Sequence, residues 1–178
     1  MNKLEIESKS LVYFILISYS LNLLIGALGF SLTEGSQAQL FLYQVGNAMA
    51  ITGSVMAGRY TGLKVQHVTA SGFILLGIAH GISLGALSKT GVNADRGVTM
   101  IMPMIPALIS MIWCDLFPRW LRIFSLVPIL FFTLTYLKVA AGESYFIWPL
   151  NFGFGSLQII EVLWAVYMYK DWKNKRIA

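Results

Sequence analysis

Four polar side chains that could do chemistry lie inside long apolar stretches of the sequence: Asn47, His80, Gln158 and Glu161. A charged carboxylate among apolar side chains in a membrane costs several kcal/mol. We therefore expect Glu161 to face a cavity or a partner, or to carry a proton. Residues of these types, placed together, indicate a pathway for a proton or a binding site for a small polar group.

Spacing along the chain extends this set by two residues. Asn151 falls on the same helical face as Gln158 and Glu161, within an arc of roughly 80°. Gln44 precedes Asn47 in the same apolar segment. Both are candidates for the walls of the same pathway.

The order of the residues along their segments predicts a polar track. Asn47 and His80 belong to the outer halves of their segments, and Gln158 leads to Glu161 in the inner half of the last segment. An equally weighted alternative is structural: His80 and Asn47 satisfy each other or a backbone carbonyl, and neutral Glu161 bonds Gln158. Buried polar pairs of that kind serve packing specificity.

Metal and cofactor sites find little support in the sequence. His67 and His80 would be about 20 Å apart on one helix, too far to sandwich one haem iron. We expect no haem within this chain alone, although another subunit could complete a site. Cys114 is the single cysteine, so it forms no intrachain disulfide or multi-cysteine metal site. The methionines of the fourth apolar segment are expected to fill the core: Met100, Met102, Met104 and Met111.

No known catalytic signature occurs. There is no Gly-x-Ser-x-Gly elbow, no His-Glu-x-x-His and no glycine-rich nucleotide loop. Enzymatic activity is therefore unsupported, though a site of unfamiliar type stays open.

Small residues recur at helical spacing in the second and third apolar segments. Such stripes let helix backbones approach closely in a membrane. They predict contacts between these two helices, or with a neighbouring subunit, at Gly46, Ala50, Gly53, Ala57, Gly77, Gly81 and Gly85.

Composition indicates the elements that must position these residues. Hydrophobic residues make up 57% of the 178 and charged residues only 12%, against roughly a quarter charged in a soluble domain. Each bilayer crossing needs roughly 20 apolar residues. We therefore predict an all-α integral membrane protein, one domain over residues 1–178, with six transmembrane helices at 11–30, 38–58, 65–88, 97–114, 120–137 and 145–169.

The basic residues predict the orientation of these helices. If the six segments all cross, ten of the 13 Lys and Arg residues fall on the side of the termini. The other side holds Lys89, Arg96 and Lys138. Basic residues favour the cytoplasmic side, so we expect both termini there, in the cell (inner, cytoplasmic) membrane. The basic loops are short and lack exposed aromatics, so no nucleic-acid partner is predicted.

Two known families share some of these features. Size, helix number and orientation resemble the substrate-binding components of energy-coupling-factor vitamin transporters. Asp95-Arg96, Pro106 and Ile159-Ile160-Glu161 resemble positions of the small six-helix urea and amide channels. The first resemblance is architectural, and the channels have the opposite orientation, so neither assigns the chain to a family.

Three functional hypotheses remain open. The leading one is a small transporter or channel-like component for a small molecule or ion, in the lipid bilayer and as a homo-oligomer or with other membrane subunits. The second is a non-catalytic membrane subunit of a larger complex, redox or secretory. The third is a membrane enzyme acting on lipid or quinone.

Overall fold

The computed structural model of the chain describes residues 3–88, 91–92, 98–142 and 148–174. This part is built from helices and one pair of two-residue antiparallel strands. The elements are α1 Lys3–Phe30, α2 Gln37–Leu63, α3 His67–Ala86, β1 Leu87–Ser88, β2 Gly91–Val92, α5 Ile101–Ser110, the 3-10 turn η1 Met111–Trp113, α6 Arg119–Phe124, α7 Val127–Ala140 and α8 Trp148–Asn174.

Five helices of the described residues are long and apolar enough to cross a membrane. They are Lys9–Phe30, Gln37–Leu63, His67–Ala86, Arg119–Ala140 and Trp148–Asn174. The expectation of an all-helical, multi-pass membrane protein is confirmed at this level. Six crossings and their orientation stay predictions.

The fourth predicted segment is shorter than expected. Instead of a helix over 97–114, the chain forms ten residues of α-helix in α5 and three residues in η1. At 1.5 Å per residue in the α-helix and 2.0 Å in the 3-10 turn, these cover about 21 Å of a hydrocarbon core about 30 Å thick. Pro106 lies inside α5, where its ring removes one backbone donor.

The fifth segment is interrupted where its proline indicated a kink. Helix α6 ends at Phe124, and α7 begins at Val127 with Pro128 in its first turn. Proline is tolerated there because the first N–H groups of a helix have no intrahelical acceptor. The interruption is also held from outside the segment, since the Trp164 indole N–H donates to Ser125 Oγ at 3.1 Å.

Other helices extend past the predicted boundaries. Helix α1 begins at Lys3, α2 continues to Leu63, and α8 continues to Asn174. The predicted segments ended near the first charged residues, but helix hydrogen bonds do not require apolar side chains. Lysines and arginines at such ends can extend towards the headgroups while the helix continues.

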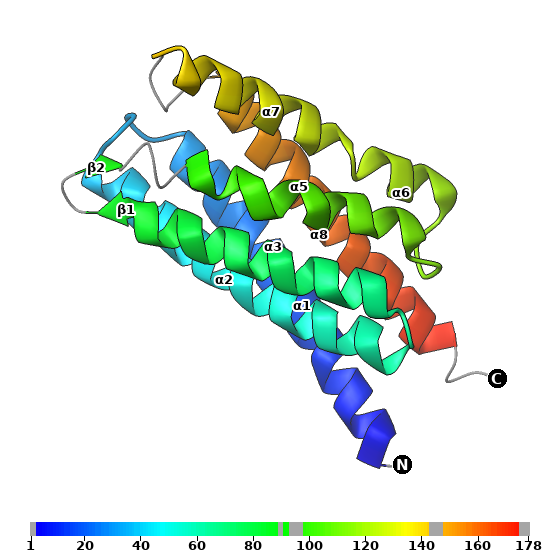
Figure 1. The fold of residues 1–178 in the computed structure, drawn as a ribbon. Helices are drawn as coiled ribbons and strands as arrows, with labels where there is room; N and C mark the ends of the chain where they lie inside the picture. Colours follow the sequence, from blue (N-terminus) through cyan, green and yellow to red (C-terminus); the bar gives the residue numbers. More distant parts are fainter. Residues whose placement is uncertain (1–2, 89–90, 93–97, 143–147, 175–178) are drawn as a thin grey trace.

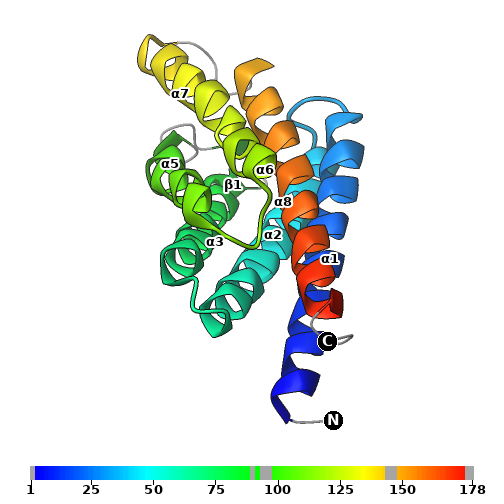
Figure 2. The ribbon, with the colours of Figure 1, turned by 90° about the vertical axis from the view of Figure 1, so that its right-hand side faces the viewer.

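The helices form a closed ring. Successive neighbours in contact are α1, α2, α3, α5, α7 and α8, and α8 packs against α1 again. Helix α1 begins and α8 ends at the same end of the bundle, whereas β1 and β2 lie at the opposite end (Figures 1 and 2). We call these the terminal end and the hairpin end.

The interior towards the terminal end is filled by aromatic side chains. Phe73 and Trp164 meet edge to face, with ring centroids 5.3 Å apart, and Phe117 stacks on Trp164 at 6.1 Å. Tyr19 is fully buried beside them in the same core, and its hydroxyl lies 3.1 Å from Ser54 Oγ. This aromatic core, defined as Tyr19, Phe73, Phe117 and Trp164, fills the inside of the ring of helices towards the terminal end.

Candidate functional site

The centre of the site is the carboxyl group of Glu161 on α8, which is fully buried. Its Oε1 atom lies 3.1 Å from His80 Nε2 on α3. Its Oε2 atom accepts a hydrogen bond of 2.8 Å from the Asn22 amide on α1. Both carboxyl oxygens therefore have a partner, as a buried carboxyl requires.

The hydrogen bonds of Asn47 determine the state of His80. Asn47 Nδ2 donates to the Tyr43 carbonyl at 2.8 Å, because a carbonyl can only accept. Asn47 Oδ1 must then be the atom 3.0 Å from His80 Nδ1, so this nitrogen carries a hydrogen. His80 Nε2 is left to face Glu161.

One proton therefore lies between His80 and Glu161. It belongs either to the carboxyl, which donates to a neutral imidazole, or to the imidazolium, which donates to a carboxylate. The two arrangements have the same net charge of zero. Removing that proton would leave the lone pair of Nε2 facing a carboxylate in a buried site, which costs free energy.

The network continues from Glu161 through Asn22 to Gln158. Gln158 Nε2 donates to Asn22 Oδ1 at 3.4 Å. A side chain on Gly26 would overlap the Gln158 amide, so the glycine of α1 makes room for this side chain of α8. The polar network, defined as Asn22, Asn47, His80, Gln158 and Glu161, thus joins α1, α2, α3 and α8.

A pocket of about 610 Å³ adjoins the polar network on the side of the hairpin end. Its volume lies within the range of roughly 300–1,000 Å³ that is typical of small-molecule sites. Its walls come from five helices, and four residues of the polar network are among the lining residues. The lining residues are Asn22, Leu23, Gly26, Ala27, Phe30, Tyr43, Gly46, Asn47, His80, Ser83, Leu87, Phe131, Leu150, Asn151, Phe152, Phe154, Gly155, Ser156, Gln158 and Ile159.

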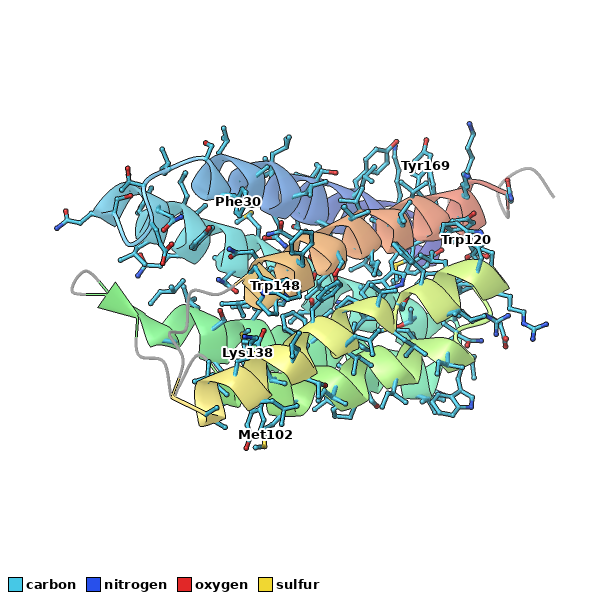
Figure 3. The ribbon with its side chains drawn as sticks, turned by 90° about the horizontal axis from the view of Figure 1, so that it is seen from above. Phe30, Met102, Trp120, Lys138, Trp148 and Tyr169 are labelled. Carbon is cyan, nitrogen blue, oxygen red and sulfur yellow. The ribbon has the colours of Figure 1, made fainter. Side chains whose placement is uncertain are left out.

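The pocket lies towards the hairpin end of the bundle, since Leu87 of β1 is among its lining residues. Figure 3 shows Phe30 and Trp148 at the hairpin end, and Trp120 and Tyr169 at the opposite end. Aromatic rings at the two ends of a bundle are typical of the two headgroup levels. The pocket therefore lies on the hairpin side of the polar network, and the buried aromatic core fills the interior towards the terminal end.

The structure brings together most of the polar residues singled out from sequence. Asn47, His80, Gln158 and Glu161 belong to one network, and Asn151 lines the pocket. Gln44 is elsewhere: its amide donates to the Leu87 carbonyl at 3.1 Å and ties α2 to β1.

The alternative structural pairing is present only in part. His80 does pair with Asn47, but the hydrogen bond given for Gln158 goes to Asn22 instead of Glu161. Asn22 was missed in the sequence, although it carries the only side-chain amide within the apolar run 11–30. An amide inside an apolar span is the same signal that identified Asn47.

The small-residue stripes make different contacts from those expected. Gly46 and Gly53 on α2 face Asn22 and Tyr19 of α1, where side chains would crowd. Gly77 on α3 faces α2 at Ser54, as predicted for a contact of these helices. Gly81 and Gly85 have open space in front of them. Ala50 and Ala57 are fully buried.

Other candidate groups do not form sites among the described residues. There, no cluster of three or more His, Cys, Asp or Glu residues could hold a metal ion. Met100, Met104 and Met111 are fully buried core residues, and Met102 is exposed. Asp95 and Arg96 lie outside the described part of the chain.

Comparison with protein families, with curated proteins and with solved structures finds no match for this chain. Its function is therefore argued from the geometry of the site.

Proposed function

We propose that this chain is a small-molecule transporter, or the substrate-binding membrane component of one. The observation that carries the proposal is a pocket of about 610 Å³ that ends at the buried His80–Glu161 pair. Transporters hold substrates near mid-membrane, where a buried titratable group can couple substrate movement to a proton.

A small molecule fits the site better than an ion. Asn47 Oδ1 and Glu161 Oε1 both face the His80 ring, and Glu161 Oε2 accepts from Asn22. These oxygens therefore do not converge on an empty centre that an ion could occupy. A conducting pore would also need a continuous path, and the aromatic core interrupts one. Transport would therefore proceed by alternate opening of the two ends.

The membrane arrangement we propose has six crossings and both termini in the cytoplasm of a cell bounded by this membrane. The basic bias of ten to three supports this orientation. The pocket would then open outwards, as suits uptake. In a homo-oligomer, or in a complex with other membrane subunits, each copy of this chain would keep its own pocket, because the pocket is lined by residues of one chain.

Two glycines allow a matched test of the pocket. Gly155 lines the pocket and Gly81 does not, and in each case an added Cβ meets only open space. Gly155→Phe should fill the pocket without disturbing the fold, whereas Gly81→Phe should place the same ring outside it. Small molecules retained by the purified proteins in nanodiscs are identified by mass spectrometry, and movement of the retained molecule is measured in proteoliposomes.

We expect wild type and Gly81→Phe to retain and move the molecule, and Gly155→Phe to do neither. Retention without movement would contradict transport by this chain alone and favour a binding component. Equal retention by all three proteins would show that the pocket is not the site, and the proposal would fail.

A second function is favoured by one observation. An imidazole and a carboxyl that share a proton beside apolar walls are also suitable for acid–base chemistry on a lipid-soluble substrate such as a quinone. Chemical conversion of the retained molecule, lost in Glu161→Gln, would identify this enzyme.

A further inference from the structure

We propose that the pocket takes a neutral, mostly apolar molecule with one hydrogen-bond-accepting oxygen, and that this molecule enters from the bilayer between α1 and α8. The inference rests on the proposed function, which leaves the class of substrate and its route open. Three features carry it: the charge of the walls, the donors at the polar end and the position of the rim.

The walls offer no compensation for a charged ligand. The lining residues include no Lys, Arg, Asp or Glu. His80 is the one lining residue with a basic side chain, and its Nε2 atom faces the carboxyl group of Glu161. A charged ligand would lose its hydration without gaining a counter-charge, which is strongly unfavourable in an apolar site. The molecule in the pocket should therefore be neutral.

The polar end of the pocket is richer in donors than in acceptors. Asn22, Asn47 and Gln158 each carry two amide N–H groups, and the network uses one donor of each amide. Of the three amide oxygens, Oδ1 of Asn22 and Oδ1 of Asn47 already accept hydrogen bonds, so three N–H groups stand against one amide oxygen, Oε1 of Gln158. This surplus would recognise an acceptor oxygen, such as a carbonyl, at the end of an apolar body.

The rim of the pocket faces lipid. Phe30 of α1 and Phe152 of α8 both line the pocket, yet they are 63% and 60% exposed. Ile159 of α8 also lines it and is 49% exposed. In a membrane, these exposed side chains would face lipid, with Phe30 near the headgroup level.

The opening between α1 and α8 has a structural basis. Figure 2 shows the two helices diverging towards the hairpin end, and at Gly26 the space beside α1 is taken by the Gln158 side chain. In this diverging region, Ala27 and Gly155 line the pocket with little or no side chain. A molecule dissolved in the adjacent leaflet could enter here without crossing water.

Photolabelling can test the class of ligand and its route together. The probe is a long-chain methyl ketone that carries a diazirine in its chain, and the comparison probe is the same alkane without oxygen. Wild type, Gly155→Phe and Gly81→Phe are labelled in nanodiscs, and the labelled residues are located by peptide mass spectrometry. Competition uses excess unlabelled ketone or a quaternary ammonium of the same chain length.

We expect the ketone to label residues 22–30 and 150–159 in wild type and Gly81→Phe, with loss of that label in Gly155→Phe. Unlabelled ketone should compete and the quaternary ammonium should not. Equal labelling in Gly155→Phe, or equal labelling by the alkane, would show contact with surrounding lipid only and overturn the inference. Competition by the cation, or retention of a water-soluble molecule that depends on Gly155, would refute the ligand class and leave the proposed function standing.

Discussion

At the scale of single residues, the proton between His80 and Glu161 is the group whose loss can be predicted most closely. The hydrogen of His80 Nδ1 is fixed by Asn47, and Asn22 donates to the second carboxyl oxygen of Glu161. A glutamine at position 161 could accept from Asn22 with its oxygen and donate to His80 Nε2 with its nitrogen. It reproduces the neutral arrangement of the pair but has no proton to release.

Glu161→Gln is therefore expected to fold as wild type and to lose proton-dependent function. Removing a buried acid also removes its desolvation cost, so thermal stability in detergent should be equal or slightly higher. Movement of the retained molecule should be lost, or should lose its dependence on pH. Glu161→Leu is the control, because it leaves His80 and Asn22 without their partner at a cost of about 1–3 kcal/mol each. A fully active, pH-dependent Gln variant would exclude Glu161 from the chemistry.

Four residues of this network and the pairing of His80 with Asn47 were predicted from sequence, but Asn22 and the partners of Glu161 were not. A polar side chain inside a long apolar segment is rare enough to identify His80, Asn47 and Glu161. Which atoms meet depends on how closely α1, α3 and α8 approach, and Gly26 sets one of those distances. The small size of Gly26 allows another helix to approach closely, but it does not indicate which helix that is.

At the scale of elements, α2 ends next to a residue whose type is unfavourable for its backbone conformation. The Val65 N–H donates to the Gly62 carbonyl at 3.0 Å, and the Gln66 N–H donates to the Thr61 carbonyl at 3.0 Å. These are the two bonds of a Schellman motif, whose residue after the C-cap is left-handed and usually glycine. Here Val65 occupies that position with φ of 61°.

Val65→Gly is expected to stabilise the protein. The left-handed conformation costs an L-residue about 1–2 kcal/mol, more than the roughly 0.5–1 kcal/mol of backbone entropy that glycine loses on folding. Val65 is 73% exposed, so little packing is lost. The apparent melting temperature in detergent should rise by about 2–4 °C per kcal/mol gained.

The matched control lies at the end of α7. Gly142 follows the C-cap Ala141 with φ of 91°, and its N–H donates to the Val139 carbonyl at 2.9 Å. Gly142→Val should lower the melting temperature for the reason that Val65→Gly raises it. Two shifts of the same sign would show that backbone strain does not govern these helix ends.

Element boundaries were less predictable than element identity. Apolar runs located the five long helices, because a helix satisfies its own backbone in lipid. The short α5 was overestimated because an apolar composition does not reveal where a helix stops. In the same way, the stripe through Gly46 and Gly53 indicated close packing, yet the helix it packs against, α1, is fixed by the closure of the whole ring.

At the scale of the whole molecule, the ring explains how a short helix can be part of a membrane bundle. Helix α5 packs against α3 on one side and α7 on the other. It is therefore held by protein along both flanks. Because α1 begins and α8 ends at the terminal end while the α1–α2 connection lies at the hairpin end, Asn174 and Glu34 lie at opposite ends of the bundle. Six crossings require these two ends to lie on opposite sides of the membrane.

Cysteine labelling can test this in the native sequence background. Cys114 is fully buried, so its thiol is shielded from water-soluble reagents. It should therefore react negligibly with maleimides near pH 7. Glu34 and Asn174 are both exposed, so cysteines introduced there report their own sides of the membrane.

We expect Glu34→Cys to react with a membrane-impermeant maleimide in intact cells, and Asn174→Cys to react only after permeabilisation. Six crossings place these two positions on opposite sides, and the basic bias places Asn174 in the cytoplasm. Reaction of both in intact cells would contradict six crossings and the placement of the two positions at opposite ends of the bundle. Reaction of Asn174→Cys alone would mean an inverted chain, and the pocket at the hairpin end would then open to the cytoplasm, which would make export its direction of transport.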